Sequence, residues 1–304
     1  MKKYFDFMRW RSVATALSVL LVVVSLASLV VRGLSFGLDF TGGTLVEVAF
    51  DKPVELQRIR DALVEGAVTD AVVQYFGQSS EVLIRIPPDL SAKKSELGQH
   101  IVSLLKRVEP TVSLKRTEFV GPQVGEELRD QSGIAMLLAL GAMLIYITFR
   151  FQFKFAVGAV VALFHDVIIV LGIFSLFGLQ FDLTVLAAVL AVIGYSLNDT
   201  IVVSDRIREN FRVDRSLTPK EIVNMSLGQT LGRTLITSLT TLLVLVALKL
   251  LGGELISGFA TALLIGVLVG TYSSIYVASN ILLLLKFRRE DLIDHAPEVM
   301  DDRP

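Results

Sequence analysis

Two carboxylates stand in apolar segments long enough to cross a bilayer. Asp199 lies in the predicted span 183–204, and Asp166 follows His165 in the predicted span 155–177. A charge at mid-membrane costs at least about 2.5–3.5 kcal/mol, so such residues usually face a protein interior or a water-filled cavity and mark ion paths. The sequence therefore predicts an ion-coupled membrane protein with Asp199 near its functional centre.

Three other polar residues are candidates for the same path. Tyr195 lies one helical turn before Asp199 on the same face, and Asn198 directly precedes it. Arg233 begins the next span at the depth of Asp199, about four residues or ~6 Å from the membrane surface, so a contact between the two is geometrically plausible. The alternatives are an anchoring role for Arg233, structural hydrogen bonding for both carboxylates, and a helix–helix hydrogen bond rather than a proton relay for His165.

Enzymatic chemistry has little basis in this chain. There are no cysteines, which excludes disulfides and thiolate metal sites, and the 3 histidines have no metal-ligand spacing. The sequence shows no nucleophile–base arrangement and no phosphate-binding glycine loop. We therefore expect no catalytic residue, no metal, no cofactor and no nucleic-acid partner.

Hydropathy predicts a helical membrane protein. The 304 residues are 53% hydrophobic and their mean hydropathy is +0.64, and about 20 apolar residues span a bilayer. Six spans are expected, at residues 13–32, 134–149, 155–177, 183–204, 234–251 and 258–285. The first resembles a signal anchor rather than a cleaved signal peptide, because its apolar run is long and no small-x-small cleavage site follows.

The distribution of basic residues predicts the orientation. Basic residues precede the first span, follow the sixth, and lie between spans two and three and between spans four and five: Lys2, Lys3, Arg9, Arg11, Arg150, Lys154, Arg206, Arg208, Arg212, Arg215, Lys220, Arg233, Lys286, Arg288 and Arg289. The loops 178–182 and 252–257 contain neither Lys nor Arg. By the positive-inside rule both termini are cytoplasmic, and residues 33–132 are extracytoplasmic.

Residues 33–132 have the composition of one small globular domain. Alternating or apolar runs predict strands at 44–50, 71–76, 82–86 and 112–120, with helices at 53–65 and 91–108 and a hairpin turn at 77–80. The order βαββαβ is the ferredoxin-like arrangement, which hosts many functions. The predicted organisation is completed by residues 1–32 (amino terminus and first span), by residues 133–289 (spans two to six) and by a cytoplasmic tail at 290–304.

Two further patterns concern structure. The predicted cytoplasmic loop 205–232 contains a capping box at Thr218-Pro-Lys-Glu221, which predicts a short amphipathic helix at the membrane surface. Small residues recur every four positions along the sixth span: Gly258, Ala262, Gly266, Gly270, Ser274 and Ala278. Such a face permits close packing of helices, here either against span four or against another subunit.

Four motifs carry a resemblance that covers essentially the whole chain. They are Gly37-Leu-Asp-Phe-Thr-Gly-Gly43, His165-Asp166, the eighteen residues from Ile193 to Asn210, and Arg233-Thr-Leu-Ile-Thr-Ser238. With six spans and one large domain after the first, they resemble the SecF members of the SecD/SecF protein-export family, in the resistance-nodulation-division superfamily. The stretch through Asp199 is the most specific, whereas the first motif is common to SecF and SecD.

The resemblance implies a partner and an energy source. SecD would supply the other six spans, and the pair would assist the SecYEG channel and the SecA motor in exporting unfolded polypeptides across the bacterial inner membrane. The proton gradient drives this, or sodium in some relatives. Residues aligned with Asp199 and Arg233 belong to the family's ion path, with Asp166 a weaker candidate. The residues Gly37, Asp39, Phe40, Thr41, Gly42 and Gly43 would couple span one to the extracytoplasmic domain.

Two other functions fit the same composition. A small-molecule efflux transporter of the superfamily would usually carry both halves in one chain and larger porter domains, whereas this chain has one domain of ~100 residues. A scaffold subunit that transports nothing is the second alternative. Asp199 distinguishes them, because a scaffold should tolerate Asn there.

Overall fold

The computed structural model describes residues 5–68, 70–88, 97–214, 216–287 and 291. Six helical spans in this part of the chain are long and apolar enough to cross a membrane, which confirms the predicted helical membrane protein. They are α1 (Arg11–Val31), α5 (Pro122–Arg150), α6 (Phe153–Phe177), α7 (Leu183–Val213), α8 (Pro219–Leu251), and a sixth formed by α9 (Glu254–Ser273), the π-helical η3 (Ser274–Ala278) and α10 (Ser279–Leu284).

Several helices extend well beyond the predicted spans. α5 begins at Pro122, twelve residues before the predicted start, with the proline in its first turn. α7 continues to Val213 and α8 begins at Pro219, so most of the predicted loop 205–232 is helical. The reason is that hydropathy detects the apolar part of a helix, whereas polar residues prolong the same helix into water. The predicted tail at 290–304 lies, apart from residue 291, outside the described residues.

The amphipathic segment after Thr218 is therefore the start of α8 and not a separate surface helix. Its capping box is present, with Thr218 accepting from the Glu221 amide. Ile222, Val223 and Leu227 are buried in the bundle core together with Phe7 and Met8 of the short η1 (Phe7–Arg9). The apolar face of the start of α8 therefore packs against η1, and not against the membrane surface as predicted.

The region 43–120 has the predicted ferredoxin-like order. It comprises β2 (Gly43–Ala49), α3 (Leu56–Glu65), β3 (Val72–Phe76), β4 (Gln78–Ile86), α4 (Leu97–Leu105) and β5 (Ser113–Val120). The sheet order is β3-β4-β2-β5, with every pair antiparallel. The start of the predicted second helix, at 91–96, lies outside the described residues. The expected turn at 77–80 shrinks to Gly77, because this glycine adopts a φ of +72° and β4 begins at Gln78.

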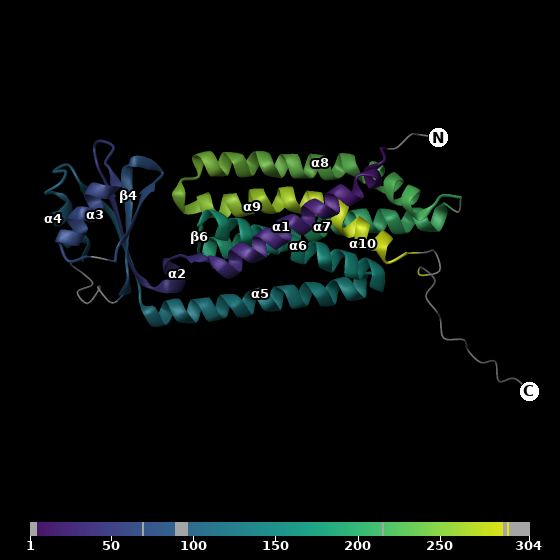
Figure 1. Cartoon of the computed structure of the whole chain (residues 1–304), viewed down its shortest axis with the longest axis horizontal. Coiled ribbons are helices and arrows are strands. Elements are labelled where there is room, and N and C mark those ends of the chain that lie inside the picture. The colour runs from purple at the N-terminus through teal and green to yellow at the C-terminus, as the bar shows by residue number, and fades with distance from the viewer. Residues whose placement is uncertain (1–4, 69, 89–96, 215, 288–290, 292–304) are drawn as a thin grey trace, which may run out of the picture.

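This α/β domain lies at one end of the helical bundle, and both ends of the chain lie at the other (Figure 1). It has its own core, in which α3 and α4 cover one face of the sheet. The chain passes between domain and bundle through β1 (Ser35–Phe36) and α2 (Leu38–Thr41). β1 pairs in parallel with β6 (Gln180–Phe181), in the turn between α6 and α7.

Candidate ion-coupling site

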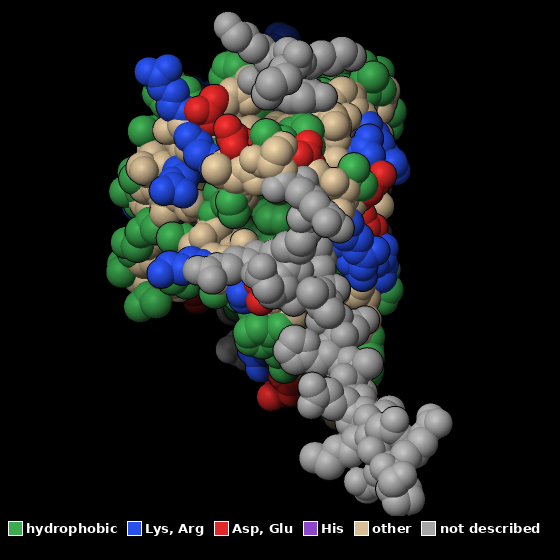
Figure 2. Space-filling view, turned by 90° about the vertical axis from the view of Figure 1, so that its right-hand side faces the viewer, with side chains coloured by type: hydrophobic (Ala, Val, Ile, Leu, Met, Phe, Trp, Pro, Cys, Tyr) green, Lys and Arg blue, Asp and Glu red, His purple; other side chains and the backbone are tan. Residues whose placement is uncertain are grey.

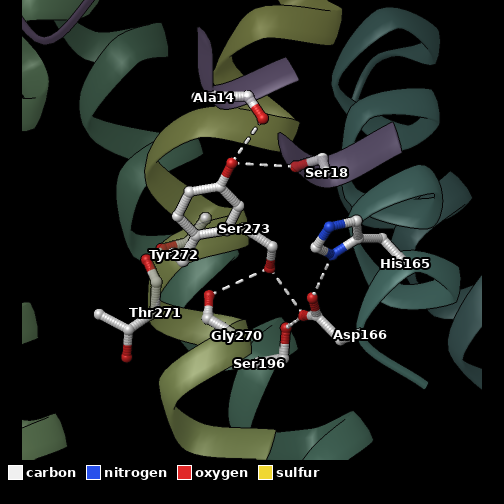
Figure 3. A network of polar contacts seen from close by, with 10 residues as sticks. Ala14, Ser18, His165, Asp166, Ser196, Gly270, Thr271, Tyr272 and Ser273 are labelled. Atoms are coloured by element: carbon white, nitrogen blue, oxygen red, sulfur yellow. Dashed lines mark hydrogen bonds and ion pairs between the residues drawn. The ribbon is translucent and has the colours of Figure 1, made fainter. Parts of the chain in front are cut away.

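Among the described residues of the bundle, Asp166 is the most completely enclosed carboxylate. Its exposed fraction is 0%, and it lies on α6 in the middle of the helical part of the molecule. Its Oδ2 accepts hydrogen bonds from Ser196 of α7 and from Ser273 of α9, the latter at 2.7 Å. Its Oδ1 lies 2.8 Å from Nδ1 of His165 (Figure 3). Three helices therefore meet at this one side chain, and its polar atoms are satisfied.

His165 continues this network toward α1. Its ring stacks on Tyr272 of α9, with centroids 6.2 Å apart, and Tyr272 donates to the carbonyl of Ala14 at 2.7 Å. The Tyr272 hydroxyl also lies 3.0 Å from the hydroxyl of Ser18 (Figure 3). Nε2 of His165 is buried and has no hydrogen-bond partner in the described structure. The imidazole borders a cavity of about 390 Å³ between α1, α6 and the η3–α10 segment.

Asp199 is the second buried carboxylate, with an exposed fraction of 9%. Its Oδ1 accepts from Thr234 of α8 at 2.7 Å, and its Oδ2 accepts from Ser274 at 2.5 Å. No ion pair with Asp199 occurs among the described residues. Within the described part of this chain, the side-chain partners of Asp199 are therefore two hydroxyl groups.

The predicted contact between Asp199 and Arg233 is not formed. Arg233 is exposed on α8, and the neighbouring Thr234 is the residue that turns toward Asp199. The reason is helical geometry, because consecutive residues are about 100° apart around the axis. Asn198 is likewise exposed on α7, whereas Tyr195 is half-buried and donates to Ser238 at 3.2 Å. Asn198 and Arg233 thus lie on the outside of this bundle.

The small residues of the sixth span pack against α7, the first of the two predicted possibilities. A Cβ on Gly266 would lie 2.1 Å from Val192, and one on Gly258 would lie 2.9 Å from Val185. Gly270 approaches Ser196 in the same way, and a Cβ there would lie 3.0 Å from the serine Cβ. Ala262 is fully buried in the bundle core. Close approach of α9 to α7 thus places Ser273, at the end of α9, and Ser274, at the start of η3, near the two carboxylates.

The motif at 37–43 lies where the domain meets the bundle. Asp39 Oδ2 accepts the Leu183 amide at 3.1 Å, at the start of α7, where free N–H groups favour a negative charge. Phe40 stacks on Phe181, with ring centroids 6.0 Å apart. Thr41 donates to the carbonyl of Gly37 at 3.0 Å. The motif therefore contacts the helix that carries Asp199.

The two glycines that end this motif are required by space and backbone conformation. Gly42 and Gly43 have φ angles of +67° and +120°. A Cβ on Gly42 would lie 2.9 Å from Pro122 of α5, and one on Gly43 would lie 2.4 Å from the carbonyl oxygen of Ile86. A side chain at either position would separate the domain from α5 or disturb β4.

Arg85 links the sheet to the same junction. It donates to the carbonyl of Phe36 at 2.7 Å. Burial lowers the pKa of the Arg85 guanidinium below its ordinary value, although arginine stays charged at neutral pH. The domain and the bundle are thus joined by directed polar contacts as well as by the chain itself.

Comparison with known proteins identifies the family. The model "Protein export membrane protein SecD/SecF, C-terminal" matches residues 100–288, and the model "SecD/SecF GG Motif" matches residues 27–54. The chain is 52% identical to protein translocase subunit SecF of Pseudomonas aeruginosa over 302 residues, covering 98% of this chain and 97% of the relative. The chain belongs to the SecD/SecF family of protein-export membrane proteins.

Further relatives extend this finding. The SecF subunit of Escherichia coli O157:H7 is 47% identical over 299 residues, covering 98% of this chain and 93% of the relative. The crystal structure of SecDF from Thermus thermophilus superposes with a TM-score of 0.85 at 40% identity, covering 94% of this chain. The match covers only 39% of that SecDF chain. These similarities favour protein export over the efflux-transporter alternative.

Sequence reasoning missed the hydroxyl partners of the two carboxylates in this SecD/SecF chain. They are Ser196, Thr234, Ser273 and Ser274. Two signals could have found some of them: Ser273 and Ser274 are adjacent in an apolar span, and Thr234 follows the predicted Arg233. Among the predicted path residues, His165 and Asp166 contact each other, whereas Asp199 has a separate set of partners.

Proposed function

We propose that this chain, paired with a SecD half, uses the proton gradient to assist the export of unfolded polypeptides, with Asp199 as the titrating group. The observation that carries this proposal is that Asp199 is buried and bonded to two hydroxyls, without a basic partner among the described residues. A hydroxyl can donate to an ionised carboxylate and accept from a protonated one. Both forms of Asp199 therefore have hydrogen-bond partners.

Protonation of such a group favours one packing of the helices over another, which makes the bundle a switch. Moving one elementary charge across 100 mV provides ~2.3 kcal/mol. This amount is enough for a modest movement of the α/β domain but not for unfolding a cargo protein. The energy source fits an assisting role beside a channel such as SecYEG and a motor such as SecA. The coupling ion is proposed as H⁺, with Na⁺ as the alternative that the resemblance implies.

The half-sized bundle supports a SecD-like partner. Arg233, Thr237 and Thr240 form an exposed polar stripe on α8, and Asn198 is exposed on α7. Lipid tails solvate such groups poorly, so polar residues in a membrane usually face protein or a cavity. A second six-helix half would cover this stripe and bring its own polar groups to Arg233. The relative from Thermus thermophilus is named a SecDF subunit, and this chain matches 39% of it.

We propose that the end of the bundle opposite the α/β domain is cytoplasmic. Lys and Arg side chains gather around this end (Figure 2). Arg150 of α5, Lys154 of α6 and Arg206 of α7 belong to it, and the first two pair with Asp205 and Asp291. The positive-inside rule then places the α/β domain outside the cytoplasm of a bacterial inner membrane.

Asp199→Asn tests the proposal. The variant retains the shape of the side chain and much of its hydrogen bonding, so we expect normal accumulation and assembly. Gradient-dependent completion of export in inverted membrane vesicles should be lost, while the ATP-driven early steps remain. Asp205→Asn is the matched control, because Asp205 lies on the same helix but is partly exposed and pairs with Arg150. Normal gradient-stimulated export by Asp199→Asn would leave the scaffold role as the better account.

A further inference from the structure

Ser273 and Ser274 hold one buried carboxylate each. Ser273 donates to Asp166 at 2.7 Å, and Ser274 donates to Asp199 at 2.5 Å. Both serines are fully buried. They are the last residue of α9 and the first residue of the π-helical η3. Short π-helical segments are rare, and those that occur often lie at functional sites. This position therefore links the two carboxylates to an unusual part of the backbone.

Each serine hydroxyl has a second acceptor in the last turn of α9. Ser273 Oγ lies 3.1 Å from the carbonyl oxygen of Gly270, and Ser274 Oγ lies 3.0 Å from that of Thr271. A hydroxyl has one proton, so it donates to the carboxylate or to the carbonyl at any moment. The backbone amide of Ser274 also donates to the Gly270 carbonyl. The two hydroxyls and one amide therefore act on adjacent carbonyls of a single turn.

We propose that Ser273 and Ser274 are positioning residues that couple the protonation of Asp166 to that of Asp199 through the junction of α9 and η3. This inference rests on the proposed function, because it concerns the same titrating site. When Asp199 is ionised, the Ser274 proton points to it. When Asp199 gains a proton, that proton is donated to Ser274 Oγ, and the Ser274 proton turns to the Thr271 carbonyl. The site as a whole gains one proton, the one that binds to Asp199.

The consequence for Asp166 follows from the shared backbone. Rotation of the Ser274 hydroxyl adds a hydrogen bond to the Thr271 carbonyl, and in the same turn the Ser273 hydroxyl shares the Gly270 carbonyl with the Ser274 amide. A change in this turn alters the donor that Ser273 presents to Asp166. In this proposal the junction of the α-helix and the π-helix has two arrangements. One is favoured when Asp199 is ionised, and the other is favoured when Asp199 is protonated.

Other titratable groups lie near Asp166 and Asp199 and could affect their protonation. Those in the middle of the helices packed together here are His165 on α6, Tyr195 on α7, Arg233 on α8, Tyr272 on α9 and Tyr276 in η3. Of these, His165 is the one with a direct contact to a carboxylate, at 2.8 Å from Asp166. The residues 12–31 of α1 include no Asp, Glu, Lys, Arg, His or Tyr.

The test measures protonation of each carboxylate separately in membrane vesicles that contain the full chain and its six-helix partner. Dicyclohexylcarbodiimide is an apolar probe that modifies protonated carboxyl groups, and mass spectrometry assigns the modified residue. We expect Asp199→Asn to displace the pH profile of Asp166 labelling by about one pH unit, the coupling at which two sites titrate as a pair. In Ser273→Ala or Ser274→Ala, the same Asp199→Asn change should leave the Asp166 profile where it is.

Ser175→Ala is the matched control, because Ser175 is a buried membrane serine that contacts Ser28 and neither carboxylate. In this background the displacement by Asp199→Asn should persist. If a serine-to-alanine variant fails to assemble, the size-matched Ser273→Cys or Ser274→Cys replaces it, because a thiol is a weak donor.

Two results would overturn the inference. One is an Asp166 profile that does not respond to Asp199→Asn in the native background. The other is an equal displacement with and without the serines, since direct repulsion would then explain the coupling. The labelling readout is independent of export, so a failure here differs from a failure of the proposed function.

Discussion

Asp166 and Asp199 differ in the donors that hold them, and in the proposed mechanism this difference gives them separate tasks. Asp166 has an imidazole and two hydroxyls around it and is fully enclosed. Asp199 has two hydroxyls and is slightly exposed, next in space to the start of the exposed stripe on α8. Asp199 is therefore better placed to exchange a proton at a partner interface. Asp166 is better placed to transmit the change to α1 through His165 and Tyr272.

Thr234 and Arg233 should have separable effects on Asp199. Thr234→Val retains the shape of the side chain but removes the hydroxyl that donates to Asp199 at 2.7 Å. The extent of carbodiimide labelling of Asp199 should therefore change, whether or not the partner is present. Arg233→Ala should alter labelling only in the paired complex, because Arg233 is exposed in this chain. An effect of Arg233→Ala on the unpaired chain would contradict this assignment.

Asp39→Ala should weaken the start of α7. The substitution removes the acceptor for the Leu183 amide, and the loss of a helix-capping carboxylate costs about 1 kcal/mol. We expect a lower thermal midpoint of the purified complex and slower gradient-dependent export. Asp39→Asn should lie between wild type and Asp39→Ala, because its amide oxygen still accepts the hydrogen bond. Equal behaviour of the two variants would show that the contact to Leu183 is not what matters.

At the residue scale, the ionisable residues of the site were predictable from the sequence, but their hydrogen-bond partners were not. Asp166, His165 and Asp199 are conspicuous because polar ionisable groups are costly in apolar spans. Ser273 and Ser274 are not, because serine is common at helix–helix contacts in membranes. The predicted Asp199–Arg233 contact was wrong within this chain, since the depth of a residue in a span says nothing about its direction around the helix.

The contact between α7 and α9 is the element that holds both carboxylates in register. Gly258, Gly266 and Gly270 permit the two backbones to approach closely, and Ser273 and Ser274 follow at the junction of α9 and η3. The period of four in the sequence predicted a smooth face, and the structure identifies its partner as α7. The interruption by η3 was not predictable, because a π-helical segment changes the hydrogen-bond pattern and leaves no distinct residue pattern.

Gly266→Ala should therefore destabilise the bundle. The added Cβ would lie 2.1 Å from Cγ2 of Val192 and 2.9 Å from its Cβ, so the branched side chain has little freedom to move aside. Overpacking of this kind costs about 1–3 kcal/mol, and we expect a lower thermal midpoint in a fluorescence-detected size-exclusion assay. Gly141→Ala in α5 is the control, because nothing lies within 4 Å of its added Cβ. A midpoint unchanged by Gly266→Ala would mean that α9 and α7 separate easily.

At the scale of the whole molecule, α7 connects the two ends of the proposed coupling. Its first residue is held by Asp39 of the motif beside the α/β domain, and its middle carries Asp199. A shift of α7 at Asp199 would therefore also displace its first residue, which contacts Asp39 at the junction of bundle and domain. The resemblance implied a link between span one and the domain. The structure adds α7 and α5 as contacts of the same motif.

The overall architecture was more predictable than the arrangement of its parts. The order βαββαβ follows from alternation and turn residues, and the sheet order agrees with it. The position of Asp39 at the start of α7 could not be predicted, because the two segments are 144 residues apart and no local pattern relates them. The comparison with SecDF relates to one part of that longer chain, which agrees with a half-sized bundle.

The orientation can be tested with single cysteines, because the native chain has none. Ser79 is exposed near the start of β4, and Ser216 is exposed between α7 and α8. In spheroplasts, a membrane-impermeant maleimide should label Ser79→Cys but not Ser216→Cys, and lysis should make both reactive. Labelling of Ser216→Cys in intact spheroplasts would reverse the orientation inferred from the basic residues.

The outer face of the bundle predicts that the chain is unstable when alone. Only 17% of the apolar window of α8 and 11% of that of α5 are buried, against 56% for α6 and for α7. Lipid can cover the apolar part of α8, but the stripe of Arg233, Thr237 and Thr240 would remain in hydrocarbon. A SecD-like half would remove this cost. We therefore expect the chain expressed alone to be degraded several-fold faster than when it is expressed with that partner, as measured by pulse-chase.

The matched variant for this experiment is Arg233→Leu, which removes the costly charge from the exposed stripe. It should lengthen the half-life of the unpaired chain, because an arginine at the bilayer centre costs about 2.5–3.5 kcal/mol and less near the surface. The same variant should not stabilise the paired chain, since the partner already shields Arg233 there. Equal half-lives of the wild-type chain with and without the partner would contradict a bundle that needs two halves. Arg233 would then be better explained as an anchor at the membrane surface.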